Sequence, residues 1–260
     1  MKKAIFKITK WFLLLTYLVC MLSFANKKSD HIICSSINLI IDKPHKFIDE
    51  ESVNNLLNTN NIKIDSCIID SINFDEIENV LEASPFIRNA EVYSKFNGQL
   101  NIIIKQRNPV MRIITNNNEH YYIDDESSLM PICNNYTANV ITVTGDISHT
   151  FVTSIDATDI KTIDKSYPYT LRELFNYVSF LNEHELWRNQ ITQIYINDSK
   201  DIELIPRVGN HIIMLGDLTN YKFKMGKLEA IYKKGFALTD WNIYSVINLK
   251  YSNQVICKKK

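Results

Sequence analysis

The sequence predicts an α+β fold, in which a small strand–helix–helix–strand–strand unit precedes a larger, largely antiparallel β domain with flanking helices. Three observations support this prediction. An amphipathic helix has to stop at Ser84-Pro85, two alternating strands meet at Asn97-Gly98, and many short strand-like runs follow from Met111 onward. At 260 residues the chain has room for two modest domains behind an apolar N-terminal segment.

The N-terminal segment predicts that the bulk of the protein is exported. Four lysines within residues 1–10 precede the apolar run of residues 11–25. Because lysines stay on the cytoplasmic side of a bilayer, we expect a cytoplasmic tail at 1–10, a single transmembrane anchor at 11–25 and a linker at 26–30. The small-x-small sequence Ser23-Phe-Ala25 leaves a cleaved signal peptide as the alternative. Both alternatives place the body of the protein outside the cytoplasm.

The first unit begins with an apolar stretch, Ile32–Ile41, that can form one strand. Asp49 is a good N-cap for the helix after it, because Ile48 and Val53 stand where a hydrophobic staple requires them. Asn73 is the expected N-cap of a second helix. The predicted buried face of this second helix consists of Phe74, Ile77, Val80 and Leu81.

A β-hairpin completes the first unit. Ala90 and Val92 alternate with polar residues before Asn97-Gly98, and an alternating run from Leu100 follows it. Asn-Gly supplies the positive φ angles of a tight hairpin turn. We expect the two helices to cover one face of a three-stranded sheet, whose outer strands offer unpaired backbone groups to a docking partner. A plain spacer is the alternative.

The second half of the chain reads as a sheet flanked by helices. A capping box at Thr170–Glu173 begins one amphipathic helix, and Tyr221–Lys234 forms another that ends at Gly235. The expected strands are Met111–Thr115, His120–Asp124, Val140–Thr144, Gln193–Asn197, Ile202–Pro206, His211–Leu215, Tyr244–Tyr251 and Gln254–Cys257.

Nothing in the sequence assembles a catalytic, cofactor or metal site. The chain has 29 basic and 29 acidic side chains, so no net basic field favours nucleic acid. His184-Glu185 begins like a metalloprotease helix, but Arg188 stands where the second histidine is needed. No nucleophile elbow and no phosphate-binding glycine loop occurs. The acidic run Asp124–Glu126 is typical of a solvated turn. The hypothesis of an enzyme therefore lacks an assembled site, and we expect no cofactor.

Lysines and cysteines leave two questions open. The lysines of the predicted helix at Tyr221–Lys234 could meet an anionic head group, although we prefer a solvated face. Cys34, Cys67, Cys133 and Cys257 lie in the exported part without a C-x-x-C spacing. Four cysteines permit three pairings, and the sequence favours none of them over unpaired thiols.

Several segments in succession resemble a known family. The stretches Pro85–Val92, Leu100–Ile104 and Gln106–Val110 resemble the end of the POTRA domain of the FtsQ/DivIB bacterial cell-division proteins. The resemblance continues in the right order through Tyr122–Asp125 with Pro131, Val143–Asp146, Leu215–Asp217 and Val246–Tyr251. It covers nearly all of the exported chain and implies a POTRA domain at residues 31–108 and a β domain at residues 109–260.

The resemblance implies a non-enzymatic scaffold in the plasma membrane at the division septum, with its bulk in the periplasm. Such proteins link early division proteins to septal peptidoglycan synthesis. Their partners are the coiled-coil proteins FtsB and FtsL, and other division proteins bind the POTRA domain. FtsB adds a strand at the last sheet edge, which here implies a partner-binding site formed by Lys250, Tyr251, Gln254, Val255 and Ile256.

The chain departs from the family pattern in two places. Ser127-Ser128 stands where many relatives have glycine in a hairpin, and no second basic contact is evident near Asn197–Lys200. Two other functions stay open at this point. One is an envelope-assembly factor that handles client strands with its POTRA-like unit, and the other is a secreted hydrolase.

Overall fold

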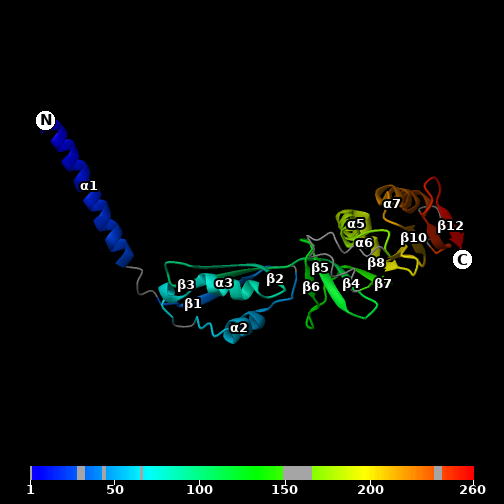
Figure 1. The fold of residues 1–260 in the computed structure, drawn as a ribbon, viewed down its shortest axis with the longest axis horizontal. Coiled ribbons are helices and arrows are strands. Elements are labelled where there is room, and N and C mark those ends of the chain that lie inside the picture. Colours follow the sequence, from blue (N-terminus) through cyan, green and yellow to red (C-terminus); the bar gives the residue numbers. More distant parts are fainter. Residues whose placement is uncertain (1, 28–32, 43–44, 65–66, 149–165, 237–241) are drawn as a thin grey trace. The chain divides into compact units, whose positions relative to one another are not determined.

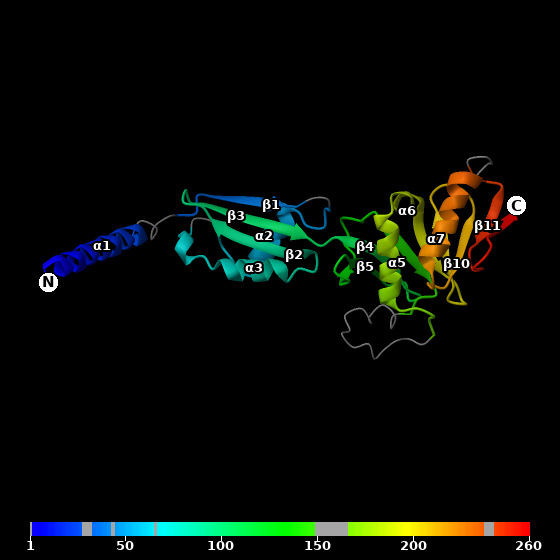
Figure 2. The same ribbon diagram turned by 90° about the horizontal axis from the view of Figure 1, so that it is seen from above.

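The computed structural model describes the chain except for residues 1, 28–32, 43–44, 65–66, 149–165 and 237–241 (Figures 1 and 2). The described residues form two compact units, unit 1 (Met1–Gln106) and unit 2 (Arg107–Lys260). Each unit has its own hydrophobic core and its own sheet, so each is described by itself.

A single helix, α1 (Lys2–Lys27), contains the segment expected to be an anchor. Among the residues described, however, no helix combines the length and the apolar character needed to cross a membrane. The anchor predicted at residues 11–25 is therefore unsupported. Its apolar run is shorter than the roughly 20 residues that usually span a bilayer core. Residues 28–30 of the expected linker lie outside the described residues.

The rest of unit 1 is the expected small α+β unit. Its strands are β1 (Ser36–Ile41), β2 (Ile87–Ser94) and β3 (Gln99–Gln106), arranged in the order β1-β3-β2. β1 runs parallel to β3, and β2 is antiparallel to it. The helices α2 (Glu50–Thr59) and α3 (Phe74–Glu82) pack on one face, and a short 3-10 turn, η1 (Ile69–Ser71), connects them. The core between helices and sheet includes Val53, Leu57, Ile77, Leu81, Leu100, Ile102 and Ile104.

The predicted helix caps are confirmed. The Asp49 carboxylate accepts the Ser52 N–H at 2.8 Å, and the Asn73 side chain accepts the Glu76 N–H at 3.3 Å. The turn at Asn97-Gly98 differs from the prediction, because only Gly98 has a positive φ, 86°. Gly98 donates its N–H to the Lys95 carbonyl, which makes a three-residue loop closed by a left-handed glycine.

Unit 2 has one nine-stranded sheet. On one side of it lie β4 (Pro109–Ile114), β5 (His120–Asp124), β6 (Leu129–Pro131) and β7 (Ile141–Gly145). The other strands are β8 (Ile191–Ile196), β9 (Ile202–Pro206), β10 (Ile212–Gly216), β11 (Tyr244–Asn248) and β12 (Ile256–Lys259). Their order is β12-β11-β10-β9-β8-β7-β4-β5-β6, so β6 and β12 form the two rims.

The sheet is mixed, which corrects the prediction of a largely antiparallel domain. Three strand pairs are parallel, β4–β7, β7–β8 and β10–β11, against five antiparallel pairs. For two of these parallel pairs, β7–β8 and β10–β11, the physical reason is the position of the helices. α5 (Leu171–Glu183) and α6 (Glu185–Gln190) lie between β7 and β8 in sequence, and α7 (Tyr221–Ala230) lies between β10 and β11. A helical crossover returns the chain in the same direction, so the flanking strands run parallel.

The helices of unit 2 lie on one face of the sheet (Figure 1). Trp187 and Tyr177 from α6 and α5 are fully buried there against strand residues such as Ile194 and Ile213. The capping box at Thr170–Glu173 is confirmed. After α7 the helix continues as a π-helical turn, η2 (Ile231–Gly235), and it ends at the expected glycine.

Candidate partner-binding edge

Four strands form the rims of the two sheets, and they differ in whether their outward backbone groups are available to pair with an added strand. In unit 1 the rim strand β2 is already covered, because Glu82 accepts the Ala90 N–H at 2.9 Å and Glu78 accepts the Val92 N–H at 2.6 Å. The expectation that both outer strands of unit 1 offer unpaired donors is therefore wrong for β2. In unit 2, β6 has only three residues and ends at Pro131, and short rims with proline accept added strands poorly.

The opposite rim of unit 2 is β12, which pairs with β11 in an antiparallel ladder. The Lys260 N–H donates to the Ile243 carbonyl at 3.1 Å, toward β11. Because main-chain groups alternate in direction along a strand, the N–H groups of Cys257 and Lys259 point away from β11. Within the described residues no further strand covers that side of β12.

The structure places the five predicted site residues around this rim but not all in the strand. Lys250 and Tyr251 lie in the connection between β11 and β12, and Gln254 and Val255 come just before β12. Ile256 is the first residue of β12, and the residue is 44% exposed. The predicted strand Gln254–Cys257 is thus displaced by two residues toward the C-terminus. Val255 packs partly against the core.

Lys250 is held by two neighbours that sequence reasoning missed. Its ammonium group is 2.5 Å from the Asp201 carboxylate of the β8–β9 turn. The hydrogen bond with Asp201 raises the pKa of Lys250 above its usual value, although partial burial opposes this. The aliphatic stem crosses Gly216, where an added Cβ would lie 3.0 Å from the lysine Cγ. Gly216 also has a φ of 78°, so glycine is required here for two reasons.

Lys227 of α7 fixes the connection between β11 and β12. Its ammonium group donates to the Tyr251 carbonyl at 2.6 Å and to the Ser252 carbonyl at 3.4 Å. Lys224, one turn earlier, is buried and donates to the Asp217 carboxylate at 2.7 Å. The preferred interpretation of these lysines as a solvated face is therefore wrong for two of them. No local pattern could reveal this, since Lys227 and Tyr251 lie 24 residues apart.

A polar network supports the β8–β9 turn that carries Asp201. Lys200 in this turn forms an ion pair with Asp146 at the end of β7, and its ammonium group also lies 4.3 Å from the centre of the Tyr167 ring. The Lys200 and Asn116 hydrogen bonds lower the pKa of Asp146 below its usual value. Burial of Lys200 acts to lower its pKa, but hydrogen bonds with Asp146 and Tyr167 outweigh it, so the pKa is raised.

The hairpin in which the family pattern expects glycine uses serine in a glycine-like conformation. Ser127 has a φ of 66°, in the left-handed region. The fully buried Asp124 side chain stabilises the turn, because its Oδ1 accepts the N–H groups of Glu126 at 3.0 Å and Ser128 at 2.8 Å. Burial raises the pKa of Asp124 despite these hydrogen bonds and the nearby Arg107. Asp124 is thus the centre of the turn and not part of a solvated run.

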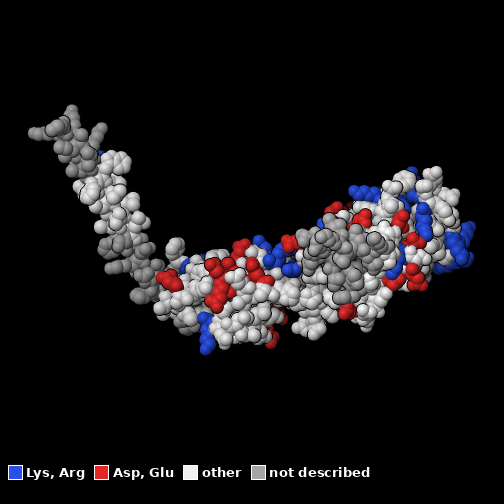
Figure 3. Space-filling view, viewed as in Figure 1, with Lys and Arg blue, Asp and Glu red and all other residues white. Residues whose placement is uncertain are grey.

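Basic side chains gather at the end of unit 2 that carries β11 and β12 (Figure 3). Lys258, Lys259 and Lys260 are all exposed there. In the part of the chain that the structure describes, no group of three His, Cys, Asp or Glu side chains is arranged to hold a metal ion. The arrangement offers backbone hydrogen bonds and positive charge.

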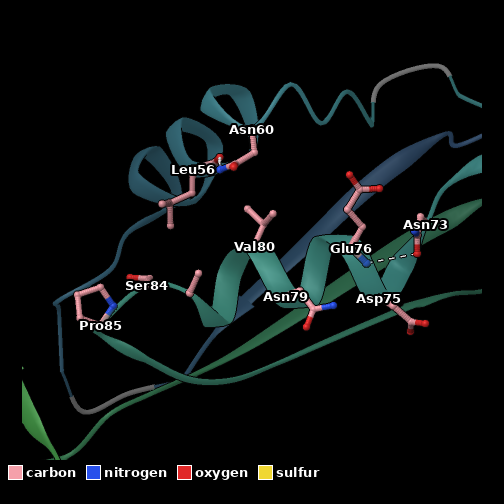
Figure 4. Close-up of a pocket in the computed structure, with 10 residues that line it drawn as sticks. Leu56, Asn60, Asn73, Asp75, Glu76, Asn79, Val80, Ser84 and Pro85 are labelled. Carbon is pink, nitrogen blue, oxygen red and sulfur yellow. Dashed lines mark hydrogen bonds between the residues drawn. The ribbon is translucent and has the colours of Figure 1, made fainter.

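Unit 1 has a separate hollow of about 590 Å³ between α2 and α3 (Figure 4). Leu56 and Val80 face into it from the two helices, and Pro85 lies at one end. Asn60, Asn73, Asp75, Glu76 and Asn79 give it a polar margin. The residues that line this hollow do not form a recognisable catalytic arrangement.

Comparison with known families identifies both units. The family model described as "FtsQ/DivIB, C-terminal related" matches residues 108–258, more than half of the chain. The chain belongs to the FtsQ/DivIB family. A second model, the POTRA-like domain, matches residues 32–105 and so covers the sheet and helices of unit 1. No curated protein matches this FtsQ/DivIB-family chain. FtsQ/DivIB proteins are generally not enzymes, and the two matched domains together indicate a scaffold in cell division.

Proposed function

We propose that this FtsQ/DivIB-family protein is a non-enzymatic division scaffold that binds partners by strand addition at β12. The partners are FtsB-like and FtsL-like coiled-coil proteins, and the complex links early division proteins to septal peptidoglycan synthesis. The POTRA-like unit recruits further division proteins, and both units act in the periplasm at the septum of the plasma membrane. The observation that carries the proposal is the rim strand β12, whose outward N–H groups face no other strand among the described residues.

The charges around β12 support a defined kind of partner. Lysines on a rim strand hinder pairing between two copies of the same protein, because like charges would lie side by side. They attract an added strand that carries Asp or Glu side chains. Lys250 is already paired with Asp201 but remains 43% exposed, so it can contact a partner from one side. Ile256 offers an exposed apolar contact on the sheet face.

The partner-binding residues are accordingly proposed in two groups. Ile256, Cys257 and Lys259 belong to the strand that would pair with the partner's backbone. Lys250 and Tyr251, held by Asp201 and Lys227, form the connection beside it, and Gln254 and Val255 lead into the strand. Rigid support of the connection reduces the entropy lost on binding.

The test removes one backbone donor and leaves the β11–β12 ladder in place. Lys259→Pro eliminates an outward N–H, whereas Lys259→Ala removes the same side chain and keeps the donor. One lost backbone hydrogen bond, with an acceptor left unpaired in the partner, costs about 1–2 kcal/mol, or roughly five- to thirty-fold in Kd. Calorimetry with an FtsB-like partner segment measures the change. Equal affinity of the two variants would mean that β12 does not pair with the partner.

A second readout tests the cellular role. A fluorescent copy of the protein should gather at mid-cell in dividing cells, and Lys259→Pro should reduce recruitment of the FtsB-like partner more than Lys259→Ala does. A uniform distribution around the cell at all stages would contradict a role in septation.

A further inference from the structure

Cys34 and Cys67 are brought together in unit 1 although 32 residues separate them in sequence. Ile33 and Ile68 form an isolated antiparallel bridge, which places Cys34 directly opposite Cys67. The Cys34 N–H donates to the Cys67 carbonyl at 2.9 Å. Directly opposite residues in an antiparallel pair have Cα atoms about 4.5–5.5 Å apart, and their side chains leave the ladder on the same side.

This geometry suits a disulfide bond. A disulfide joins Cα atoms about 4.4–6.8 Å apart, so the backbone is already within range. Opposite Cβ atoms lie about 4.5–5.5 Å apart, and closure to the usual ~3.8 Å needs an approach of roughly 0.7–1.7 Å. Each thiol is free in the structure and has only a weak local contact, Cys34 with the Ser36 carbonyl at 3.9 Å and Cys67 with the Lys63 carbonyl at 3.3 Å. Little is lost when the thiols turn toward each other.

The remaining exported cysteines cannot pair with each other. Cys257 lies in β12 at one rim of the unit 2 sheet, and Cys133 follows β6 at the other. Neighbouring strands are about 4.8 Å apart, so nine strands separate the two rims by more than roughly 30 Å. Burial also raises the pKa of the Cys257 thiol, which reduces its thiolate fraction. If Cys34 pairs with Cys67, the remaining two cysteines, Cys133 and Cys257, are therefore too far apart to form a second disulfide.

We infer that Cys34 and Cys67 form a disulfide that ties the chain before β1 to the connection between α2 and η1, while Cys133 and Cys257 stay reduced. The inference rests on the proposed function in one respect, since it needs the oxidising compartment to which that function assigns the protein. The bond closes a loop around α2, whose packing on the sheet depends on few core residues. Small domains with little core gain most from such a covalent tie.

The oxidant is a disulfide-bearing protein or small molecule. Cys67, the less buried of the two, attacks one sulfur of the external disulfide as a thiolate, forms a mixed disulfide and releases the other sulfur as a thiolate. Cys34, once deprotonated, then attacks the Cys67 sulfur. The protein disulfide forms, and the second sulfur of the oxidant leaves. The protein loses two electrons and two protons, and the oxidant gains them as a pair of thiols.

Mass spectrometry of the purified full-length chain tests the inference. The protein is equilibrated with oxidised and reduced glutathione, denatured and alkylated with N-ethylmaleimide. We expect three of the five cysteines to be alkylated before reduction and all five after it. Trypsin should release residues 29–46 linked to residues 64–88. The Cys133→Ser variant is the matched control and should keep this link, whereas Cys67→Ser should lose it.

Two results would overturn the inference: alkylation of all five cysteines under oxidising conditions, or a link between any other pair. Protein trapped with acid directly from growing cells should carry the same linked peptides, and a reduced pair there would also contradict it. Binding of the FtsB-like segment is measured on the same samples. If the disulfide is absent and the partner segment still binds, the disulfide is rejected and the proposed scaffold function is not. If Lys259→Ala and Lys259→Pro both lose binding to the same extent and the linked peptides are present, strand addition at β12 is rejected and the disulfide is not.

Discussion

The ion pair between Lys200 and Asp146 is expected to stabilise unit 2 and to do so in a pH-dependent way. Replacement of Lys200 by Met keeps an unbranched side chain and removes the charge, together with the ammonium contact to the Tyr167 ring. The two side chains are only 17% and 31% exposed, so solvent screens the pair incompletely. Lys200 also donates to the Asp146 carbonyl at 3.2 Å, and that bond is lost as well.

The free-energy cost of removing this ion pair lies between two limits. Exposed ion pairs contribute about 0–1 kcal/mol, and removal of one partner from a fully buried pair costs about 3–5 kcal/mol. For this partly buried pair we expect Lys200→Met to lower the free energy of unfolding by about 2 kcal/mol. In a domain of this size that corresponds to a fall in Tm of roughly 4–8 °C.

The pH dependence follows from the direction of the pKa shifts. The pKa of Asp146 is depressed in the folded state, so its contribution is present above the ordinary value of 3.8 and is lost as pH falls through the folded value. The pKa of Lys200 is raised, so its contribution is lost only at strongly alkaline pH, above 10.5. The destabilisation by Lys200→Met should therefore be full at pH 7 and smaller at pH 3.

Urea unfolding followed by tryptophan fluorescence provides the assay. Trp187 is buried in the unit 2 core, and residues 31–106 contain no tryptophan, so the signal follows unit 2 without interference from the POTRA-like fold. A double-mutant cycle with Asp146→Asn isolates the coupling between the two side chains. A coupling energy below about 0.5 kcal/mol at pH 7, or one that is the same at pH 3, would refute the reasoning.

Two further predictions concern local stability. Gln106 lies at the end of β3, and its side-chain amide bonds to the connection between β1 and α2. Its Oε1 accepts the N–H groups of Phe47 and Ile48 at 2.9 and 3.1 Å. Its Nε2 donates to the carbonyls of Asp42 and His45, both at 2.8 Å. Gln106→Ala should destabilise unit 1 by about 2–3 kcal/mol, because the buried N–H groups of Phe47 and Ile48 lose this acceptor, and hydrogen exchange of residues 46–57 should accelerate. The same change at Gln99 on this strand should have little effect. Ser127→Gly should stabilise unit 2 by about 0.5–1 kcal/mol, since glycine adopts the positive φ without strain, and a lower urea midpoint than the wild type would contradict this.

Much of unit 1 could be predicted because its signals are local. The Asp49 and Asn73 caps, the stop at Ser84-Pro85 and the alternation around Asn97-Gly98 each depend on residues a few positions apart. Even there, the coverage of β2 by Glu78 and Glu82 was missed. Those contacts depend on where α3 lies against the rim, and the sequence pattern of a helix does not report which strand end it meets.

The sequence by itself determined the number and type of most elements, and an ordered series of short motifs along the chain indicated the family. The elements follow from periodicity, capping and turn residues, which act over one or two turns of chain. Only the tertiary structure decided that the unit 2 sheet is mixed, that β12 begins at Ile256, and that Asp201 and Lys227 hold the connection beside it. The same holds for Cys34 opposite Cys67. Each of these depends on segments that are distant in sequence meeting in space, and strand order and register are set by the packing of the whole core.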